Sequence, residues 1–263
     1  MLDPQDLRRH IVYGIGDDKA QVFSTGSIPG LHDVNVLGIS AAPSMVGFLL
    51  QAAKNDVLTN NNSSNAPNQN HSRLNDAANL GFYIATFDRD GNYKELILLP
   101  LPGPIFRFAI LSSGEFLVLG LDPHGNTPKL MLLGSQGDLE RSIDLPELSQ
   151  KTVAGSATSM RQAMTAAITA GSVLFMPHNG NVLVWRPGST GPVFEIQAGG
   201  GIREIPLMVP KGYTLADFVP SNDRLIAHFR PSDAKNGVAM NLSDYAYYEV
   251  NPSDGSLTAK LNL

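Results

Sequence analysis

The sequence contains no cysteine and few charged residues, and each shortage excludes a class of function. Without cysteine the chain has no disulfide, no thiolate nucleophile and no redox motif. Charged side chains make up 16% of the residues, and the formal net charge is −5. A nucleic-acid-binding domain needs a basic surface to replace the counterions around phosphate groups. The composition therefore argues against nucleic acid as a partner.

The sequence also lacks a segment with the pattern of a signal peptide or a membrane helix. Residues 1–14 have no basic start followed by an apolar core. Residues 34–53 are uncharged over about the length that a spanning helix needs, but they include Asn35, Gln51 and a turn at Pro43 and Ser44. We therefore predict no membrane partner. The compartment is not determined by the sequence, although a signal peptide encoded upstream of Met1 would indicate an exported or periplasmic protein.

Familiar catalytic motifs are missing as well. There is no G-x-S-x-G elbow and no Cys–His pair, and no two histidines have the spacing of metal ligands. Gly199, Gly200 and Gly201 resemble a phosphate-binding loop, but Pro206 and Pro210 interrupt any helix behind them. The sequence therefore gives no catalytic residues, no metal site and no cofactor.

What the chain does contain is a repeat of strand, turn and strand. Copies begin near His10, Gly81, Lys129, Asn181 and Ala246, and each has a short apolar run, a turn and an alternating second run. The turn glycines of the last four copies are predicted to be Gly91, Gly137, Gly191 and Gly255. Short strands joined by Gly-containing turns are the strongest local signal for β-hairpins.

A second hairpin pattern lies between these copies, with turns near Ser44, Gly114, Gly171 and Asn222. Alternation of the two hairpins predicts antiparallel units of four strands, of which residues 106–145 are the clearest. Within this scheme, residues 160–170 become the first strand of the third unit, although their Ala and Met content favours a helix. Continuous apolar runs such as Phe116–Leu121 are typical of strands that are covered on both faces.

The predicted fold class is all-β, a β-propeller of four-stranded antiparallel blades, with a β-sandwich as the alternative. About four and a half blades are counted: four complete units and an N-terminal half-unit at Arg9–Thr25. Residues 1–263 are expected to form one propeller domain or an N-terminally incomplete propeller. Unpaired edge strands in such an array could mediate association. Residues 54–80, rich in Asn, are expected to be a flexible insertion loop.

The units resemble those of the β-propeller superfamily, in particular NHL-type and TolB-like six-bladed propellers. The resemblance rests on the turn Asp88–Tyr93, of sequence DRDGNY, followed by an alternating strand. The lone Trp185 precedes Arg186, so there is no Trp-Asp dipeptide, and the paired-glycine signature of kelch propellers is not present. The resemblance implies the fold and assigns no functional family. The DRDG residues are expected to form a hairpin turn, with contacts within the turn, rather than to bind calcium.

The long connections are predicted to lie on one side of the array, and functional residues tend to lie in such loops. Polar residues at the ends of innermost strands on that side are candidates for a ligand-binding site in a concavity. Histidines in the same connections, which include His178–Asn181, are added to this set. The candidate ligand-binding residues are Asp33, Asn35, Arg107, Gln162, Asp217, His124 and His178.

Two functions follow from this pattern. The first is a non-catalytic binding or scaffold propeller that uses its long-loop face for a protein or carbohydrate partner. The alternative is a metal-dependent hydrolase, similar to a lactonase, with an axial site whose oxygen ligands would be Asp33, Asn35 and Asp217.

Overall fold

The computed structural model describes residues 2–3, 6–12, 21–25, 28–54, 80–101, 104–121, 128–144, 172–219, 224–232 and 245–261. The first sheet, here called sheet I, has three strands in the order β1 (Leu2–Asp3), β2 (Asp6–Val12) and β3 (Gln21–Ser24). β2 and β3 form the predicted N-terminal outer hairpin. β1 adds a third strand, which the sequence did not predict.

Four further sheets each contain four antiparallel strands in sequential order. Sheet II contains β4 (Leu31–Ala41), β5 (Val46–Lys54), β6 (Leu80–Phe87) and β7 (Tyr93–Leu99). Sheet III contains β8 (Ile105–Ile110), β9 (Phe116–Leu121), β10 (Pro128–Leu133) and β11 (Leu139–Ile143). Sheet IV contains β12 (Leu174–His178), β13 (Asn181–Trp185), β14 (Val193–Ile196) and β15 (Ile202–Ile205). Sheet V contains β16 (Tyr213–Val219), β17 (Leu225–Pro231), β18 (Ala246–Val250) and β19 (Leu257–Leu261).

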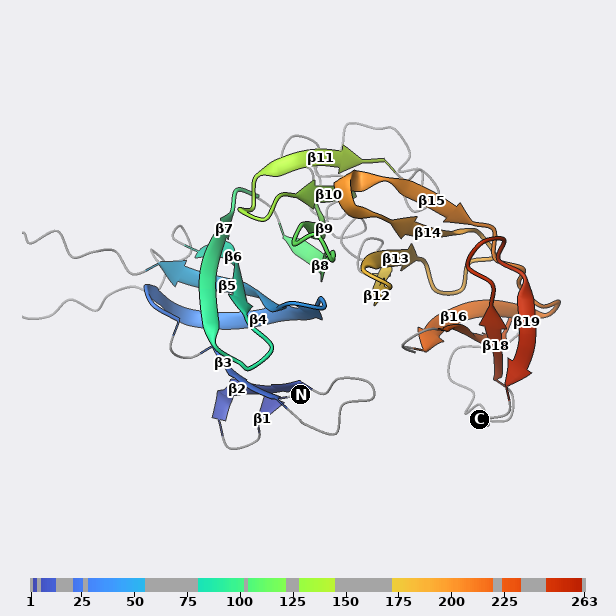
Figure 1. Cartoon of the computed structure of the whole chain (residues 1–263), viewed down its shortest axis with the longest axis horizontal. Coiled ribbons are helices and arrows are strands. Elements are labelled where there is room, and N and C mark those ends of the chain that lie inside the picture. The colour runs from blue at the N-terminus through green and yellow to red at the C-terminus, as the bar shows by residue number, and fades with distance from the viewer. Residues whose placement is uncertain are drawn as a thin grey trace, which may run out of the picture.

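The sheets follow one another around an arc, with the first strand of each four-stranded sheet nearest the centre (Figure 1). The innermost strands of neighbouring sheets contact each other, β4 with β8 and β8 with β12. Radial four-stranded sheets with strands running in order from the centre outward are the defining arrangement of a β-propeller. The described part of the chain is therefore a propeller of four blades and one three-stranded sheet, which confirms the predicted fold class.

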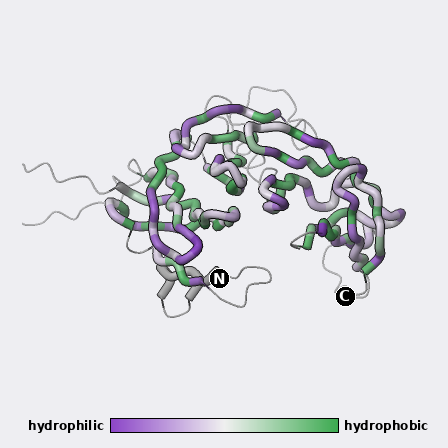
Figure 2. Tube along the Cα trace, viewed as in Figure 1, coloured by the Kyte–Doolittle hydropathy of each residue, from purple (hydrophilic) through white to green (hydrophobic). Residues whose placement is uncertain are grey.

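Polarity changes along each sheet from the centre to the rim. The outermost strands β7 and β11 have more hydrophilic residues than the strands inside them (Figure 2). β9 is buried at every position, as its continuous apolar run predicted, whereas four of the five residues of β11 are exposed. An outermost strand has a free edge, and polar side chains there oppose pairing with other chains.

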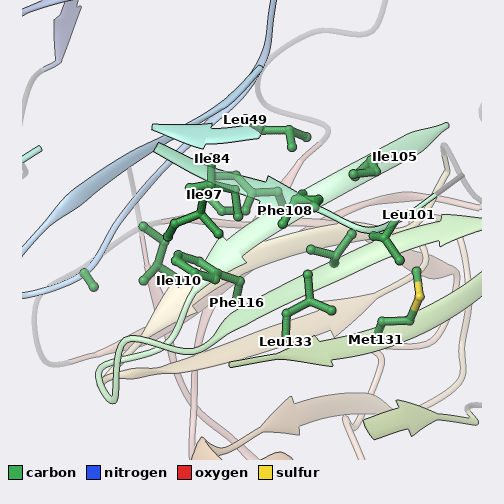
Figure 3. Packing of buried hydrophobic residues seen from close by; sticks show 13 residues of the cluster. Leu49, Ile84, Ile97, Leu101, Ile105, Phe108, Ile110, Phe116, Met131 and Leu133 are labelled. Atoms are coloured by element: carbon green, nitrogen blue, oxygen red, sulfur yellow. The ribbon is translucent and has the colours of Figure 1, made fainter. Parts of the chain in front are cut away.

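Layers of apolar side chains fill the space between successive sheets. Between sheets II and III, Leu49 and Ile84 of one sheet pack with Phe108 and Phe116 of the next (Figure 3). Similar buried clusters lie between sheets III and IV and between sheets IV and V. Since each sheet shares a core with its neighbours, burial rather than local propensity determines which residues occupy the middle strands.

A recurring turn connects the third and fourth strands of each four-stranded sheet. Each turn contains a glycine with positive φ, at Gly91, Gly137, Gly200 and Gly255. The backbone N–H of each donates to the carbonyl three or four residues earlier. The glycine lies against the preceding sheet: a β-carbon at Gly255 would lie 2.4 Å from the Pro206 carbonyl oxygen, and one at Gly91 would lie 2.7 Å from that of Val22. Glycine is thus required both by conformation and by close approach.

The predicted phase of the third unit is wrong by one strand. β12 and β13 form its first hairpin, and Asn179 and Gly180 make the turn between them. Gly191 lies in the connection between β13 and β14, and the turn glycine is Gly200. The fourth strand, β15, lies within residues 198–213, which the sequence predicted to be one of the long connections. Two of its four residues, Arg203 and Glu204, are charged. Because β15 lacks an apolar run, the sequence pattern did not reveal it.

The remaining elements of that prediction lie outside the described residues. These are residues 160–170, which were predicted to be the first strand of the third unit, and residues 55–79 of the Asn-rich segment. The division of the chain into one domain with a flexible insertion therefore stays a prediction.

Candidate functional site

The two sides of the propeller differ in their connections. The sequential antiparallel order places the β5–β6, β9–β10, β11–β12, β13–β14 and β17–β18 connections on one side, here called the long-connection side. The turns within each hairpin lie on the other, the short-turn side. The β13–β14 connection, residues 186–192, contacts the next sheet, since the backbone N–H of Gly188 donates to the Leu215 carbonyl at 2.7 Å.

Asp33 and Asn35 lie near the start of β4, at its long-connection end, and both are exposed. Asp33 has a φ of 51°, a left-handed conformation that Asp adopts more readily than most residues. It coincides with an irregularity in the pairing of β4 with β5 between His32 and Asn35. The innermost strand of sheet II therefore presents two polar side chains at a locally distorted edge.

Arg107 has structural partners. Its Nε donates to the Val173 carbonyl at 3.1 Å, and Nη1 donates to the Phe106 carbonyl at 2.8 Å. Val173 precedes β12, so the guanidinium joins the innermost strand of sheet III to that of sheet IV. A guanidinium has five N–H donors, so one side chain can make both of these hydrogen bonds.

His178 is not in a long connection, contrary to the prediction. It ends β12 beside the Asn179–Gly180 turn on the short-turn side, and only 7% of its surface is exposed. Its Nε2 is 3.2 Å from Nδ2 of Asn179. Burial lowers the pKa of His178, while the neighbouring Glu195 opposes this shift. The other two candidates, His124 and Gln162, lie outside the described residues.

A buried ion pair next to His178 was not predicted from the sequence. Glu195 of β14 is 3% exposed. Nε and Nη2 of Arg203 on β15 each lie 2.7 Å from its Oε2. Nη1 of Arg203 donates to the Pro252 carbonyl at 2.7 Å, in the β18–β19 turn. The pair therefore links sheet IV to sheet V, and burial of a carboxylate at this site depends on Arg203.

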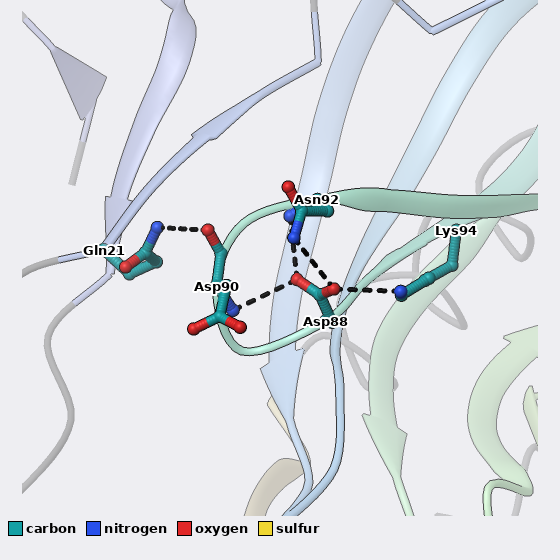
Figure 4. Close-up of polar contacts among 5 residues, drawn as sticks. All are labelled: Gln21, Asp88, Asp90, Asn92 and Lys94. Atoms are coloured by element: carbon teal, nitrogen blue, oxygen red, sulfur yellow. Dashed lines mark hydrogen bonds and ion pairs between the residues drawn. The ribbon is translucent and has the colours of Figure 1, made fainter.

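The DRDG turn is occupied by its own hydrogen bonds (Figure 4). The Asp88 carboxylate accepts from the backbone N–H groups of Asp90 and Asn92, from Asn92 Nδ2, and from Lys94 Nζ at 2.9 Å. Chiefly because of Lys94, followed by Asn92, the pKa of Asp88 is well below its usual value. Gln21 of sheet I donates to the Asp90 carbonyl at 2.6 Å. These contacts give the turn a structural role at the boundary between sheets I and II.

The outward face of sheet V, defined as the face turned away from sheet IV, holds a row of polar and aromatic side chains. Asp217 of β16 pairs across the strands with His228 of β17, and His228 pairs with Tyr247 of β18. The His228 and Tyr247 rings are stacked, with centroids 4.6 Å apart and planes at 4°. Tyr245 lies on the same ring, at 4.8 Å and 43°. Residues on either side of this row, such as Ala227 and Phe229, point into the core shared with sheet IV.

His228 lies at the centre of this row. Its Nε2 is buried, and among the described residues no group forms a hydrogen bond with it. Burial lowers the pKa of His228, and the Asp217 carboxylate opposes part of this shift. The imidazole is therefore neutral at pH 7. Oδ1 of Asp217 accepts from the backbone N–H of Phe218 at 2.7 Å. Of the four residues of this aromatic row, Asp217, His228, Tyr245 and Tyr247, the sequence singled out only Asp217.

The outward face of sheet V differs from the corresponding faces of the other sheets. The middle strands of sheet III present Leu117, Leu119, Leu130 and Leu132 to sheet IV. Sheet V instead presents His228 and Tyr247 at its centre, with Glu249 beside them. Alternate residues of a strand share a face. The apolar content of β17 and β18 therefore did not show which of their residues would lie on the outward face of sheet V. The signal in the sequence was the alternation of Ala227, His228 and Phe229, which the sequence analysis assigned to a hairpin with its turn near Asn222.

The described ranges contain neither a cluster of metal-binding side chains nor a membrane-spanning helix. There, no three His, Asp or Glu side chains come together in a way that could hold a metal ion. In the same part of the chain, no helix has both the length and the apolar character needed to cross a bilayer.

The fold makes this chain a β-propeller, and solved propellers are among the structures similar to it. A Bacteroides caccae protein of unknown function is 14% identical, with a TM-score of 0.36 over 97% of this chain and 72% of its own. Staphylococcus aureus virginiamycin B lyase is 13% identical, with a TM-score of 0.38 over 91% and 72%. The propeller domain of the Pyrococcus furiosus Trilobed protease is 7% identical, with a TM-score of 0.37 over 87% and 70%.

No family model and no curated protein matches the sequence. At these identities the structural likeness concerns the fold, and the activities of those proteins are not carried over to this chain. The narrower resemblance to NHL-type and TolB-like propellers stays a prediction.

Proposed function

We propose that this protein is a binding propeller whose long-connection side holds a protein or carbohydrate partner. The observation that carries the proposal is the aromatic row on sheet V, Asp217, His228, Tyr245 and Tyr247. Tyr245 immediately precedes β18, so the row begins where the β17–β18 connection returns to the sheet. A rigid sheet that presents aromatic and carboxylate groups beside long connections is a suitable scaffold for ligand binding.

The metal-dependent hydrolase receives no support from the positions of its ligands. Asp217 projects from the outward face of sheet V, opposite His228, whereas Asp33 and Asn35 belong to β4 of sheet II.

The absence of cysteine allows a direct test of the proposed side. Thr190 is exposed in the β13–β14 connection on the long-connection side, and Ser135 is exposed in the β10–β11 turn on the short-turn side. Thr190→Cys and Ser135→Cys each create one thiol, through which the protein is immobilised in either orientation. Arrays of defined oligosaccharides and peptides are then passed over both surfaces.

Binding is expected on the Ser135→Cys surface and is expected to be greatly reduced on the Thr190→Cys surface. Equal binding in the two orientations, or binding only to the Thr190→Cys surface, would contradict the proposed side. If neither surface binds any oligosaccharide or peptide, the binding function itself is rejected.

A further inference from the structure

The geometry of sheet V points to a specific ligand class: we propose that the outward face of this sheet binds a neutral oligosaccharide at Asp217, His228, Tyr245 and Tyr247. This inference rests on the proposed binding function and narrows it to one surface and one chemistry. The site is distinct from the predicted axial mouth, since its residues lie on the face of one sheet rather than on the innermost strands of several.

The first argument is rigidity. His228 stacks on Tyr247 directly across the strands, and Tyr245, which immediately precedes β18, contacts the same imidazole. All three rings are partly buried, and they are anchored on strands that pack into the core between sheets IV and V. His228 is thus a positioning residue that fixes two tyrosines. A preordered aromatic platform loses little conformational entropy when a flat ligand binds to it.

The second argument is the hydrogen-bonding capacity of the site. Oδ1 of Asp217 accepts from Phe218, and among the described residues its Oδ2 has no hydrogen-bond donor. Asp217 is exposed. A carboxylate that retains acceptor sites can bind hydroxyl groups through charge-assisted hydrogen bonds. Tyrosine adds an apolar ring together with a hydroxyl group. A sugar presents the complementary groups, which are hydroxyls along its edges and C–H groups on its faces.

The third argument is charge. The nearest cations on sheet V already have neighbours of their own. Nη1 of Arg224 is 3.8 Å from Glu249 Oε2, and Arg230 extends toward Gly188 in the β13–β14 connection. No arginine or lysine is therefore directed at the Asp217–Tyr247 row among these contacts. Among the described residues Asp217 has no ion-pair partner, so a phosphate or carboxylate ligand would be repelled by its carboxylate. A neutral ligand meets no such repulsion.

The fourth argument is the contrast with the other sheets. At the corresponding middle-strand positions, sheets II and III present Leu49, Ile84, Leu117 and Leu130 to the sheet that follows. A face that packs against another sheet holds a charged group only where that group is paired, as Glu195 of sheet IV is with Arg203. The outward face of sheet V contains Asp217 together with the unpaired Nε2 of His228. Its chemistry is that of a ligand surface.

The test uses the full chain and a panel of neutral probes: the hexaoses of cellulose, laminarin, xylan, starch and chitin. Binding is measured by isothermal titration calorimetry for the wild type and for Asp217→Asn and Tyr247→Leu. Tyr93→Leu is the control, because Tyr93 is an exposed tyrosine on β7 of sheet II, at its short-turn end and on a different sheet from the proposed site. Unfolding midpoints in urea identify any variant that no longer folds. Tyr247→Phe, which retains the ring, is a second and milder variant.

At least one hexaose is expected to bind, and Asp217→Asn is expected to weaken it by about tenfold or more, as loss of a charge-assisted hydrogen bond implies. Tyr247→Leu should abolish detectable binding, Tyr247→Phe should weaken it less, and Tyr93→Leu should leave it unchanged. The affinity should be the same in 1 M NaCl, since a neutral ligand is not screened by salt.

Three results would overturn this inference. These are loss of hexaose binding in 1 M NaCl, which would show that binding depends on a salt-screened interaction; unchanged affinity in both Asp217→Asn and Tyr247→Leu; and no binding of any hexaose. If the oriented arrays nevertheless bind a peptide or another glycan on the long-connection side, the proposed function stands and only the sheet V site is rejected.

Discussion

Gly255→Ala is expected to destabilise the protein more than Gly212→Ala, although both residues have a left-handed backbone. Their φ values are 72° and 83°. A β-carbon at Gly255 would lie 2.4 Å from the Pro206 carbonyl oxygen and 2.7 Å from its carbon, whereas one at Gly212 would meet nothing within 4 Å. The pair therefore separates the cost of the backbone conformation from the cost of crowding between sheets IV and V.

The expected magnitudes follow from these two costs. Alanine in the left-handed region costs about 1–2 kcal/mol at either position. Overpacking against a backbone carbonyl adds about 1–3 kcal/mol at Gly255 alone. The β18–β19 turn cannot simply move away, because the Gly255 carbonyl accepts from Met208 N–H and the Gly255 N–H donates to the Asn251 carbonyl. We expect a loss in the free energy of unfolding of about 2–5 kcal/mol for Gly255→Ala, and about 1–2 kcal/mol for Gly212→Ala.

Trp185 provides the assay. It is the single tryptophan of the chain, is 1% exposed, and packs edge-on against Phe218 of sheet V with ring centroids 5.0 Å apart. Its fluorescence therefore reports separation of sheets IV and V during urea unfolding. The free energy is obtained by linear extrapolation, and equal slopes are needed for the comparison. Equal losses of stability in the two alanine variants would refute the close approach of the β18–β19 turn to sheet IV.

Two further predictions concern charged groups. Arg203→Met should reduce the free energy of unfolding by about 3–5 kcal/mol, because it leaves the buried Glu195 carboxylate unpaired. Adding Glu195→Leu in the same chain should restore most of this loss. If the double variant does not recover stability, the assigned pairing is contradicted. Glu140→Gln should raise the thermal midpoint at pH 7. Partial loss of hydration, followed by the neighbouring Glu115, raises the pKa of Glu140, so the native state favours the protonated form and ionisation costs stability as pH rises. The difference between variant and wild type should therefore disappear below about pH 4, and a difference that persists there would contradict the repulsion.

The repeat was the most predictable feature of the chain. Apolar runs and turn glycines identified sheets II, III and V, because each strand of these sheets combines an apolar pattern with a recognisable turn. Sheet IV was assigned with the wrong phase for a specific reason. The 186–192 connection contains Pro and Gly like a hairpin turn, and β15 contains charged residues like a loop. Local composition does not distinguish these cases, since pairing with β14 is what makes residues 202–205 a strand.

The candidate site was less predictable than the fold. Arg107 and His178 were selected as polar residues near strand ends, yet the structure gives Arg107 a bridging role and places His178 in a buried turn. Asp217 was selected as a residue of an innermost strand, and it does lie on β16, where it pairs across the strands with His228. Chain position predicted which residues are polar and near an end, but the direction of a side chain depends on strand register and bulges.

The sequence alone determined the repeating unit, the all-β class and the positions of glycines such as Gly91, Gly137 and Gly255. These features depend on local conformation and on alternation along a single strand, both of which are written in neighbouring residues. Only the tertiary structure decided that Arg203 neutralises Glu195 and that His228 stacks with Tyr247. These contacts join strands that are distant in the chain, and their geometry is fixed by the pairing register and by the apolar layers that hold the sheets together.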